Sequence, residues 1–289
     1  MLREAIARLR PRDPLILLYH RVTHLANDRW SIAVTPAHFA EQMEVLHRRA
    51  TALPLSALGD SVTRPNAMAA KVVVTFDDGY ADNLHEALPI LQRFDVPATV
   101  FVATDAVVRS REFWWDDLER LVAPSDYDAV WARLRDVGGR EREGALDALR
   151  DAAGVDSAPR PEKRPLTPDE LVCLARGVRI AIGAHTASHA RLAALTGAEQ
   201  RADIETGLKA VESIIGRRIE SFAYPFGRAG DYTAETMAIV REAGFTRACS
   251  NQAGRVDRST DRYALPRLYV RDWNGDEFAA ALHDLGLRV

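Results

Sequence analysis

Two adjacent carboxylates, Asp77 and Asp78, stand directly after a short apolar run. The run Lys71–Phe76 has valine at three consecutive positions, which is typical of a strand covered on both faces in a parallel sheet. The carboxyl ends of such strands form the functional face of α/β folds, so we expect both aspartates in a site. A cap on a helix beginning near Ala81 would account for Asp78 but not for the pair.

Two histidines, His185 and His189, follow a second apolar run and are four residues apart. On a helical turn this spacing places both imidazoles on one face, where they could share a metal ion. Thr186 stands where the His-Glu-x-x-His signature of zinc proteases has glutamate, which excludes that signature. His20 and His24 have the same spacing, but an extended chain would separate them by about 13 Å, so we favour the later pair.

A third apolar run leads into a turn over Ser221–Gly227, which contains Pro225. The proline and glycine could simply form the turn. Alternatively, a rigid turn could present backbone N–H groups to an oxyanion that develops during a reaction.

To act together, these motifs need a fold in which the ends of several strands meet. Short β-rich runs alternate with helical patterns along most of the chain, as such a fold requires. The predicted strands are Leu15–Tyr19, Lys71–Phe76, Ala98–Val102, Val178–Gly183, Ile219–Tyr224, Phe245–Cys249 and Arg267–Val270. Helix caps are predicted at Thr35, Thr167 and Thr196, the last two with a glutamate three residues later. We therefore expect an α/β fold, built as one barrel or as an open sheet.

One segment, from about residue 112 to 164, contains no convincing strand. Val130, Leu134 and Val137 recur there at helical spacing, and a proline-rich tract follows at Ala158–Pro161. We expect a helical insertion at about 112–164 within one domain that spans residues 1–289. The segment could instead be a lid.

The composition excludes unusual classes of protein. The chain has 289 residues and a net charge of −3, with 27% charged residues, which argues against a strongly basic nucleic-acid binder. Its 47% of hydrophobic residues argues against a disordered chain. The first residues lack the apolar segment of a secretory signal, and no apolar run could cross a bilayer. We expect a cytoplasmic protein without a transmembrane segment. The basic stretch Arg8–Arg12 could approach the inner face of a membrane or form a solvated face.

The motifs at Thr75–Gly79, His185–His189 and Phe222–Gly227 have the order and separation typical of the polysaccharide deacetylase family. These are the NodB-homology, metal-dependent carbohydrate esterases. The segments Leu18–Val22 and Leu265–Arg267 are similar to the family's bacterial exopolysaccharide-modifying branch. The resemblance covers nearly the whole chain except the insertion.

This resemblance implies a distorted (β/α) barrel with about seven parallel strands. It implies that Asp78, His185 and His189 hold a divalent metal, preferably zinc, with Co²⁺, Ni²⁺ or Mn²⁺ as alternatives. Two imidazoles and one carboxylate leave positions open for water and substrate, as in catalytic zinc sites. Asp77 would be the general base that takes the proton from the water.

The same resemblance implies an oxyanion and substrate-binding turn. The backbone N–H of Phe226 would help to hold the tetrahedral oxyanion, and Tyr224 lies in the same motif. Tryptophans often form stacking surfaces for sugars but are more often core residues. Among Phe113–Trp115 and Trp273, we place Trp115 in the site.

Two functional positions depart from the family pattern. Many members have an arginine at the start of the third motif that orients the catalytic carboxylate, whereas this chain has Ser221–Ala223. We expect Arg267 to replace it; an unrelated salt bridge is the alternative. The general acid is unassigned, because His283 fits a solvated helix end. His20 is a further neighbour of the site.

We therefore expect a hydrolase that removes acetyl groups from an N-acetylated amino sugar of a polysaccharide, an oligosaccharide or a lipid-linked glycan. An O-acetyl sugar esterase and an inactive carbohydrate-binding relative are the alternatives. A glycosidase is disfavoured, because its two carboxylates must flank a sugar at about 5 Å or more. We expect no nucleic-acid partner, and the sequence leaves the oligomeric state open.

Overall fold

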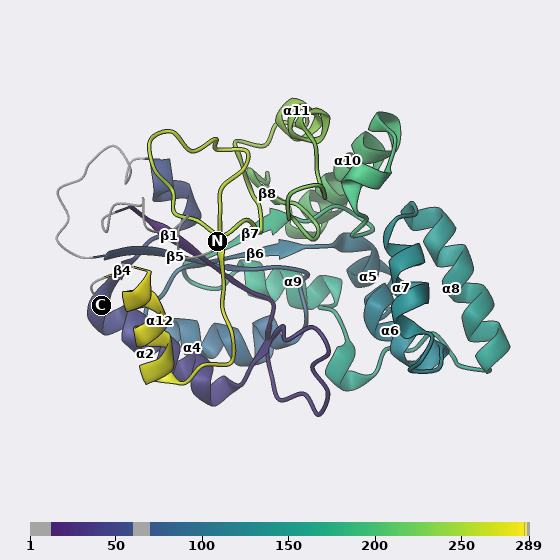
Figure 1. Ribbon diagram of the computed structural model, residues 1–289, viewed down its shortest axis with the longest axis horizontal. Coiled ribbons are helices and arrows are strands. Elements are labelled where there is room, and N and C mark those ends of the chain that lie inside the picture. The colour runs from purple at the N-terminus through teal and green to yellow at the C-terminus, as the bar shows by residue number, and fades with distance from the viewer. Residues whose placement is uncertain (1–12, 60–69, 286, 288–289) are drawn as a thin grey trace.

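The computed structural model describes residues 13–59, 70–285 and 287. Its centre is a sheet of parallel strands in the order β10-β1-β5-β6-β7-β8-β9, with β4 (Ala50–Ala52) beside the first half of β5 (Figure 1). The strands on this path are β1 Leu15–Tyr19, β5 Ala70–Phe76, β6 Ala98–Val102, β7 Ile180–Ala184, β8 Ser221–Ala223, β9 Arg247–Cys249 and β10 Leu268–Tyr269. Each matches a predicted strand, and the predicted distorted barrel of about seven parallel strands is confirmed.

The consecutive apolar residues of the strands are explained by burial on both faces of the sheet. In β5, Val72 and Val74 belong to the main core, which the surrounding helices cover. Val73 lies between them and packs in a separate apolar cluster with Ile16 and Phe101 of neighbouring strands. Such strands have no solvent-facing side and therefore show no alternation of polar and apolar residues.

The segment Leu265–Tyr269 links the two edges of the sheet. Leu265 pairs with Cys249 at the end of β9, and Leu268 pairs with Leu17 of β1. Pro266 and Arg267 lie between these two pairings, so Arg267 stands where β9 and β1 approach each other. Arg267 thus lies beside the strand ends that carry the predicted site.

Helices cover the outside of the sheet and begin largely where the sequence predicts. Thr35 caps α2 (Pro36–Arg49), and Thr167 and Thr196 form capping boxes at α9 (Pro168–Ala175) and α10 (Gly197–Ile215). Two more capping boxes, at Thr233 and Asn274, begin the last two helices. Among the described residues, the remaining helices outside the predicted insertion are η1 Leu55–Ala57, η2 Asn83–Ala87, α4 Leu88–Arg93, α5 Thr104–Arg109, η4 Leu192–Ala194, α11 Ala234–Glu242 and α12 Gly275–Asp284. The short strands β2 Arg21–Val22 and β3 Ala33–Val34 pair with each other, apart from the main sheet.

Three α-helices and one short 3₁₀ helix fall within the predicted insertion. These are α6 (Trp114–Leu121), α7 (Tyr127–Arg135) and α8 (Gly139–Ala153), followed by the short η3 (Pro161–Lys163). They group together at one end of the molecule, next to α5 (Figure 1). They enclose an apolar cluster of their own, which includes Trp114, Leu134 and Leu146.

No helix of the described ranges is long and apolar enough to span a membrane. The basic stretch Arg8–Arg12 lies outside the described residues.

Candidate metal and catalytic site

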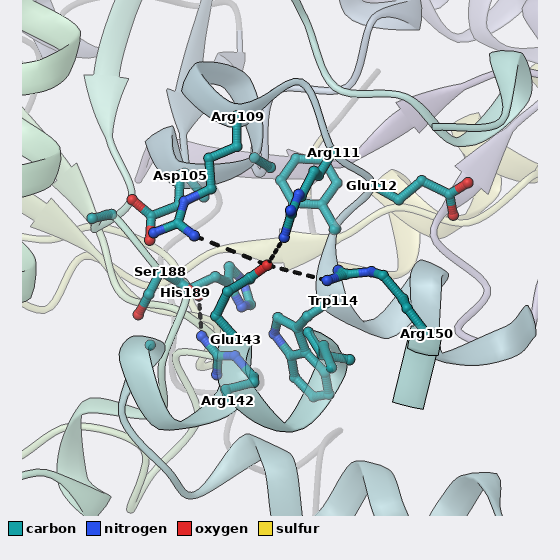
Figure 2. A pocket seen from close by; sticks show the side chains of 16 residues that line it. Asp105, Arg109, Arg111, Glu112, Trp114, Arg142, Glu143, Arg150, Ser188 and His189 are labelled. Carbon is teal, nitrogen blue, oxygen red and sulfur yellow. Dashed lines mark hydrogen bonds and ion pairs between the residues drawn. The ribbon is translucent and has the colours of Figure 1, made fainter. Parts of the chain in front are cut away.

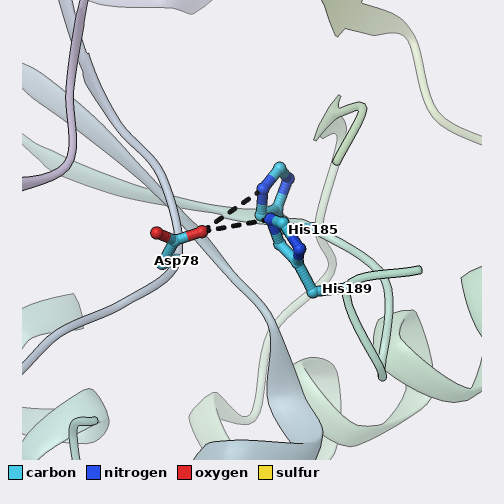
Figure 3. A group of neighbouring side chains, drawn as sticks. All are labelled: Asp78, His185 and His189. Carbon is cyan, nitrogen blue, oxygen red and sulfur yellow. Dashed lines mark ion pairs between the residues drawn. The ribbon is translucent and has the colours of Figure 1, made fainter. Parts of the chain in front are cut away.

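Asp78, His185 and His189 come together at the carboxyl ends of β5 and β7. One possible ligand atom from each lies within 4.8 Å of the other two, and all three side chains are buried. The Asp78 carboxylate faces both imidazole rings (Figure 3), with Oδ1 3.6 Å from Nε2 of His185 and 3.3 Å from Nε2 of His189. Two imidazoles and one carboxylate form the donor set of a metal site with open positions.

The backbone around this group is in the left-handed region. The φ angle is +75° at Asp78, +64° at Thr186 and +54° at His189. Each such residue costs about 1–3 kcal/mol and persists only where the surrounding structure enforces it. Residues 185–190 form a loop, so the predicted helical turn between the histidines is wrong. The left-handed backbone brings the rings together instead, and the Thr186 hydroxyl accepts a 2.9 Å hydrogen bond from the His189 N–H.

His185 is oriented by the neighbouring strand β8. Its Nδ1 lies 2.8 Å from the carbonyl oxygen of Ala223. Because a carbonyl oxygen only accepts, Nδ1 carries the proton and Nε2 presents its lone pair towards Asp78. This arrangement is the one that a metal-ligating histidine requires.

The electrostatics of the group also fit a divalent cation. Burial lowers the pKa of His185 to about 4 and that of His189 to about 3, so both imidazoles are neutral at pH 7 and can act as ligands. Oδ1 of Asp78 is buried and receives no hydrogen bond within the described part of the chain. A buried acceptor without a donor is costly, and a bound cation would satisfy it.

Asp77 has a different partner from Asp78. Its two carboxylate oxygens accept hydrogen bonds of 2.7 and 2.6 Å from Nη1 and Nη2 of Arg267. The guanidinium also donates to the Ser250 carbonyl, the Thr75 hydroxyl and the Asn251 side-chain oxygen. Both members of the ion pair are buried, at 0% and 1% exposure. Arg267 therefore holds Asp77 in one orientation.

This ion pair keeps Asp77 charged. Burial raises the pKa of Asp77, but the Arg267 guanidinium outweighs burial and lowers it to about 2. Burial raises the pKa of Asp78, which forms no ion pair with an arginine among the described residues. The two adjacent carboxylates therefore lie in different environments, one paired with a cation and the other facing two neutral imidazoles.

A cavity of about 410 Å³ opens in front of both carboxylates and both histidines. Five aromatic residues from distant parts of the chain contribute to its lining: Trp30, Trp115, Trp131, Phe226 and Tyr269. A cavity of this size accommodates one or two sugar rings, and aromatic faces suit their apolar sides.

A family model for polysaccharide deacetylases matches residues 65–248. The chain belongs to the polysaccharide deacetylase family. This family comprises carbohydrate esterases that hydrolyse the amide bond of N-acetyl groups and is metal-dependent in general. The predicted family and enzyme class are therefore confirmed.

Similar proteins extend the match over most of this deacetylase-family chain. YxkH of Bacillus subtilis (strain 168) is 23% identical over 280 residues, which cover 96% of this chain and 78% of YxkH. The structure of the deacetylase PplD of Streptococcus pyogenes has a TM-score of 0.67 at 17% identity and covers 94% of this chain and 99% of its own. IcaB of Ammonifex degensii has a TM-score of 0.64 at 18% identity, with 95% and 97% covered. At these identities, the two structures support the fold.

The structure places Phe226 and Trp115 at the cavity of the deacetylase. Phe226 has a φ of +60°, and its ring packs edge-on against that of His189 with centroids 4.9 Å apart. Trp115 lies 4.5 Å from the same imidazole, stacks on Phe113 and is only 6% exposed. Trp115 is therefore a fixed part of the wall, with its Nε1 donating to the hydroxyl of Tyr80.

Tyr224 lies elsewhere. Its side chain is fully buried, stacks on Tyr232 and donates its hydroxyl to the carbonyl of Tyr263. The predicted substrate contact of Tyr224 is therefore wrong for this side chain, because it has neither exposed surface nor a place in the cavity lining.

The two histidines considered beside the metal group differ in position. His20 lines the cavity, with its ring 5.3 Å from that of Tyr269, and its buried Nδ1 has no hydrogen-bond partner among the described residues. His283 is exposed near the end of α12, as expected for a solvated helix end. His20 is therefore the neighbour of the site.

Sequence reasoning missed several residues of the cavity. Asn251 links the Arg267 guanidinium to the Phe226 carbonyl, which accepts a 2.6 Å hydrogen bond from Nδ2 of Asn251. Trp131 stands in α7 with its ring 4.9 Å from that of Trp30, far away in sequence. The ring of Trp131 also lies 6.1 Å from that of Phe226. No local pattern marks these positions.

A second, smaller cavity lies behind His189, between α5 and α8 (Figure 2). There Arg109, Arg111 and Arg150 all pair with the Glu143 carboxylate. Arg142 of α8 donates to the carbonyl of Ser188, one residue before the second histidine. Arg142 thus attaches α8 to the loop that carries the proposed ligands, and Glu143 joins α8 to the end of α5.

Two glycines allow helices to approach this loop closely. A Cβ at Gly207 of α10 would overlap the carbonyl carbon of Thr186, and one at Gly139 of α8 would overlap Cβ of Ser188. The loop is therefore held between two helices whose contacts leave no room for a methyl group.

Proposed function

We propose that this chain is a metal-dependent deacetylase that hydrolyses the N-acetyl group of an amino sugar within a glycan. The observation that carries the proposal is the Asp78, His185 and His189 group next to an Asp77 that Arg267 holds as an anion. A binding module would need neither a ligand set with neutral imidazoles nor a buried, oriented carboxylate beside it. The intact group therefore supports an enzyme over the inactive, carbohydrate-binding alternative.

Asp78, His185 and His189 would hold the cation. When bound there, a divalent cation would supply a Lewis acid for the acetyl carbonyl and for the attacking water. The donor set favours zinc, which we propose over Co²⁺, Ni²⁺ or Mn²⁺. Its identity is tested by the metal content of the purified protein.

Asp77 is the proposed general base. Its carboxylate is ionised and lies 4.0 Å from Nε2 of His185, close to the proposed metal position. Arg267, which also donates to Asn251, holds the Asp77 carboxylate so that it can accept a proton from the water without rotating away. The water oxygen bonds to the acetyl carbon, the C–N bond breaks, and acetate and an amine are formed.

The Phe226 turn would support the oxyanion. The left-handed backbone at Phe226 lies beside His189, and its carbonyl is tied to Asn251. A backbone held in this way can keep its N–H directed at the developing negative charge without reorganisation. The leaving amine needs a proton, and His20, which also lines the cavity, is a candidate to donate it.

The test is acetate release from matched N-acetyl and O-acetyl sugars, before and after treatment with a chelator. Release from the N-acetyl sugars that disappears with chelator and returns with Zn²⁺ or Co²⁺ supports the proposal. Release from O-acetyl sugars alone would indicate the esterase instead. Full activity in excess chelator would contradict the metal mechanism.

The glycan itself stays a prediction. We propose an exopolysaccharide, a free oligosaccharide or a lipid-linked glycan, acted on in the cytoplasm or at the inner face of the membrane. Comparing acetate release from lipid-linked glycan with release from the same free glycan separates these substrates. Fractionation of cells tests the location.

A further inference from the structure

Three arginines line the substrate cavity, each from a different part of the chain. Arg135 belongs to α7, Arg228 follows the Phe226 turn, and Arg271 follows β10. The whole chain has a net charge of −3, so this concentration of positive charge does not reflect its composition.

Two of these arginines have no carboxylate partner among the described residues. Arg228 is exposed, and its guanidinium makes no ion pair there. Arg271 is also exposed; it donates to the carbonyl of Ser31 and lies over the ring of Tyr269, 4.4 Å from its centroid. Both guanidinium groups therefore retain hydrogen-bond donors for a ligand.

Arg135 shares its carboxylate with another arginine. Its Nε lies 3.0 Å from Oδ1 of Asp136, whereas Arg191 contacts both oxygens of that carboxylate at 2.6 and 2.8 Å. The Arg135 guanidinium also lies over the rings of Trp131 and Phe226, at 5.2 and 5.8 Å from their centroids. The guanidinium is thus held against two aromatic residues, one of which, Phe226, packs on His189.

The carboxylates of the cavity do not neutralise these arginines. Asp77 is occupied by Arg267, and Asp78 faces the two histidines. The remaining lining carboxylate, Asp231, is buried and accepts the backbone N–H of Arg228 at 2.9 Å. The cavity mouth therefore has three guanidinium groups against one acidic side chain outside the catalytic group.

We propose that the substrate is an acidic glycan, with a carboxylate or phosphate group close to the N-acetylated sugar. Arg135, Arg228 and Arg271 would bind this group, because the guanidinium fork matches the oxygens of carboxylates and phosphates. The inference rests on the proposed deacetylase function and specifies its substrate class.

The chemistry of the product agrees with such a substrate. Deacetylation turns a neutral amide into an amine, which is a cation when protonated. A basic cavity repels a chain that consists only of such amines and binds it less well after each turnover. An acidic group next to the amine offsets this repulsion, so the cavity suits a glycan in which the two alternate.

The test compares three substrates of equal length by their kcat/KM for acetate release. One alternates N-acetylglucosamine with glucuronic acid, the second is its carboxyl-reduced, neutral counterpart, and the third is the neutral chain with a terminal phosphate. We expect kcat/KM to be about tenfold higher for at least one acidic substrate than for the neutral one, and the ratio to fall as salt is added. The two acidic substrates distinguish a uronic acid from a phosphate as the recognised group.

Variants connect the preference to the arginines. Arg135→Gln, Arg228→Gln and Arg271→Gln should each lower the acidic-to-neutral ratio about two- to fivefold, the range of an exposed ion pair. Arg133→Gln is the matched control: Arg133 is exposed on the same helix as Arg135 and does not line the cavity, so its ratio should match wild type.

The outcome separates this inference from the proposed function. Acetate release without preference for an acidic substrate would overturn the acidic glycan but leave the deacetylase. If no substrate releases acetate, calorimetric binding of the same three substrates gives the ratio without turnover. Equal or tighter binding of the neutral substrate would then overturn the inference as well.

Discussion

The two sides of the substrate cavity are built in different ways. The barrel side carries Asp77 and Asp78 at the end of a strand, with Arg267 buried beneath them. The other side is an aromatic wall, formed by Trp115 of α6 and Trp131 of α7 with Trp30 from an early loop. The barrel side fixes charged groups and therefore the reaction, whereas the aromatic wall fixes the shape that a substrate must have.

The two sides of the cavity also differ in the interactions that stabilise them. On the barrel side, the buried ion pair pays a desolvation cost and is retained through its many hydrogen bonds. The aromatic wall depends on ring packing, as between Trp30 and Trp131. A substitution on the barrel side should therefore abolish turnover, and one on the aromatic wall should mainly weaken substrate binding.

The largest effect is expected for Asp78→Asn. Removing this charge from the proposed ligand set should eliminate bound metal and lower kcat about a thousandfold. Metal content by mass spectrometry and acetate release check this together. The control is Glu205→Gln, at a half-buried carboxylate of α10 that pairs with Lys209 and does not line the cavity; this variant should keep both the metal and the activity. Normal activity of the Asp78 variant would remove this residue from the site.

The second-largest effect is expected for Arg267→Gln. Without its guanidinium, Asp77 loses its orientation, and we expect kcat to fall about 10- to 100-fold with a smaller change in KM. The variant should also lose about 3–5 kcal/mol in the free energy of unfolding, measured in urea, because a buried charge is left unpaired.

The matched control for Arg267 is Arg255→Gln. Arg255 is also buried, but it binds the carbonyls of Asp13 and Leu285 far from the cavity lining. It should lower stability without lowering the kcat of the folded fraction. An equal loss of kcat in both variants would mean that Arg267 acts through stability alone.

Gly207→Ala tests whether the packing of α10 on the histidine loop supports the proposed metal ligands. The added methyl group would overlap the backbone at Thr186 and displace the loop of the two histidines. We expect metal affinity to fall about tenfold, as for other changes behind metal ligands. Gly144→Ala on α8, where a Cβ meets nothing within 4 Å, should leave metal affinity unchanged.

The smallest effect is expected on the aromatic wall. Trp131→Ala removes the ring that packs on Trp30 and Phe226, and we expect KM to rise about three- to tenfold with little change in kcat. Trp131→Phe keeps an aromatic face and should recover part of the loss. A fall in kcat as large as that of the Arg267 variant would contradict the division between the two sides.

The same division explains what the sequence could predict. The strand ends at Asp77 and His185 are marked by local apolar runs, so their meeting at one edge follows from parallel topology. Capping residues such as Thr167 are equally local signals. Arg267 was expected to replace the missing motif arginine because it stands at the start of a late predicted strand; that strand is β10, which β1 separates from β5.

Other features depend on contacts that no local pattern records. Trp131 and Asn251 reach the cavity only through the packing of distant segments. The histidine loop was predicted as a helical turn, because spacing alone does not reveal the left-handed backbone at Thr186. Tyr224 is adjacent to the functional turn in sequence, yet its side chain points into the core.

The most direct test of the central claim is acetate release by the metal-loaded Asp77→Asn protein. If Asp77 is the base and Asp78, His185 and His189 hold the metal, this variant should bind the same amount of metal as wild type. Its kcat on an N-acetylated glycan should be at least about a hundredfold lower than that of wild type. Wild-type turnover with an unchanged metal content would contradict the account.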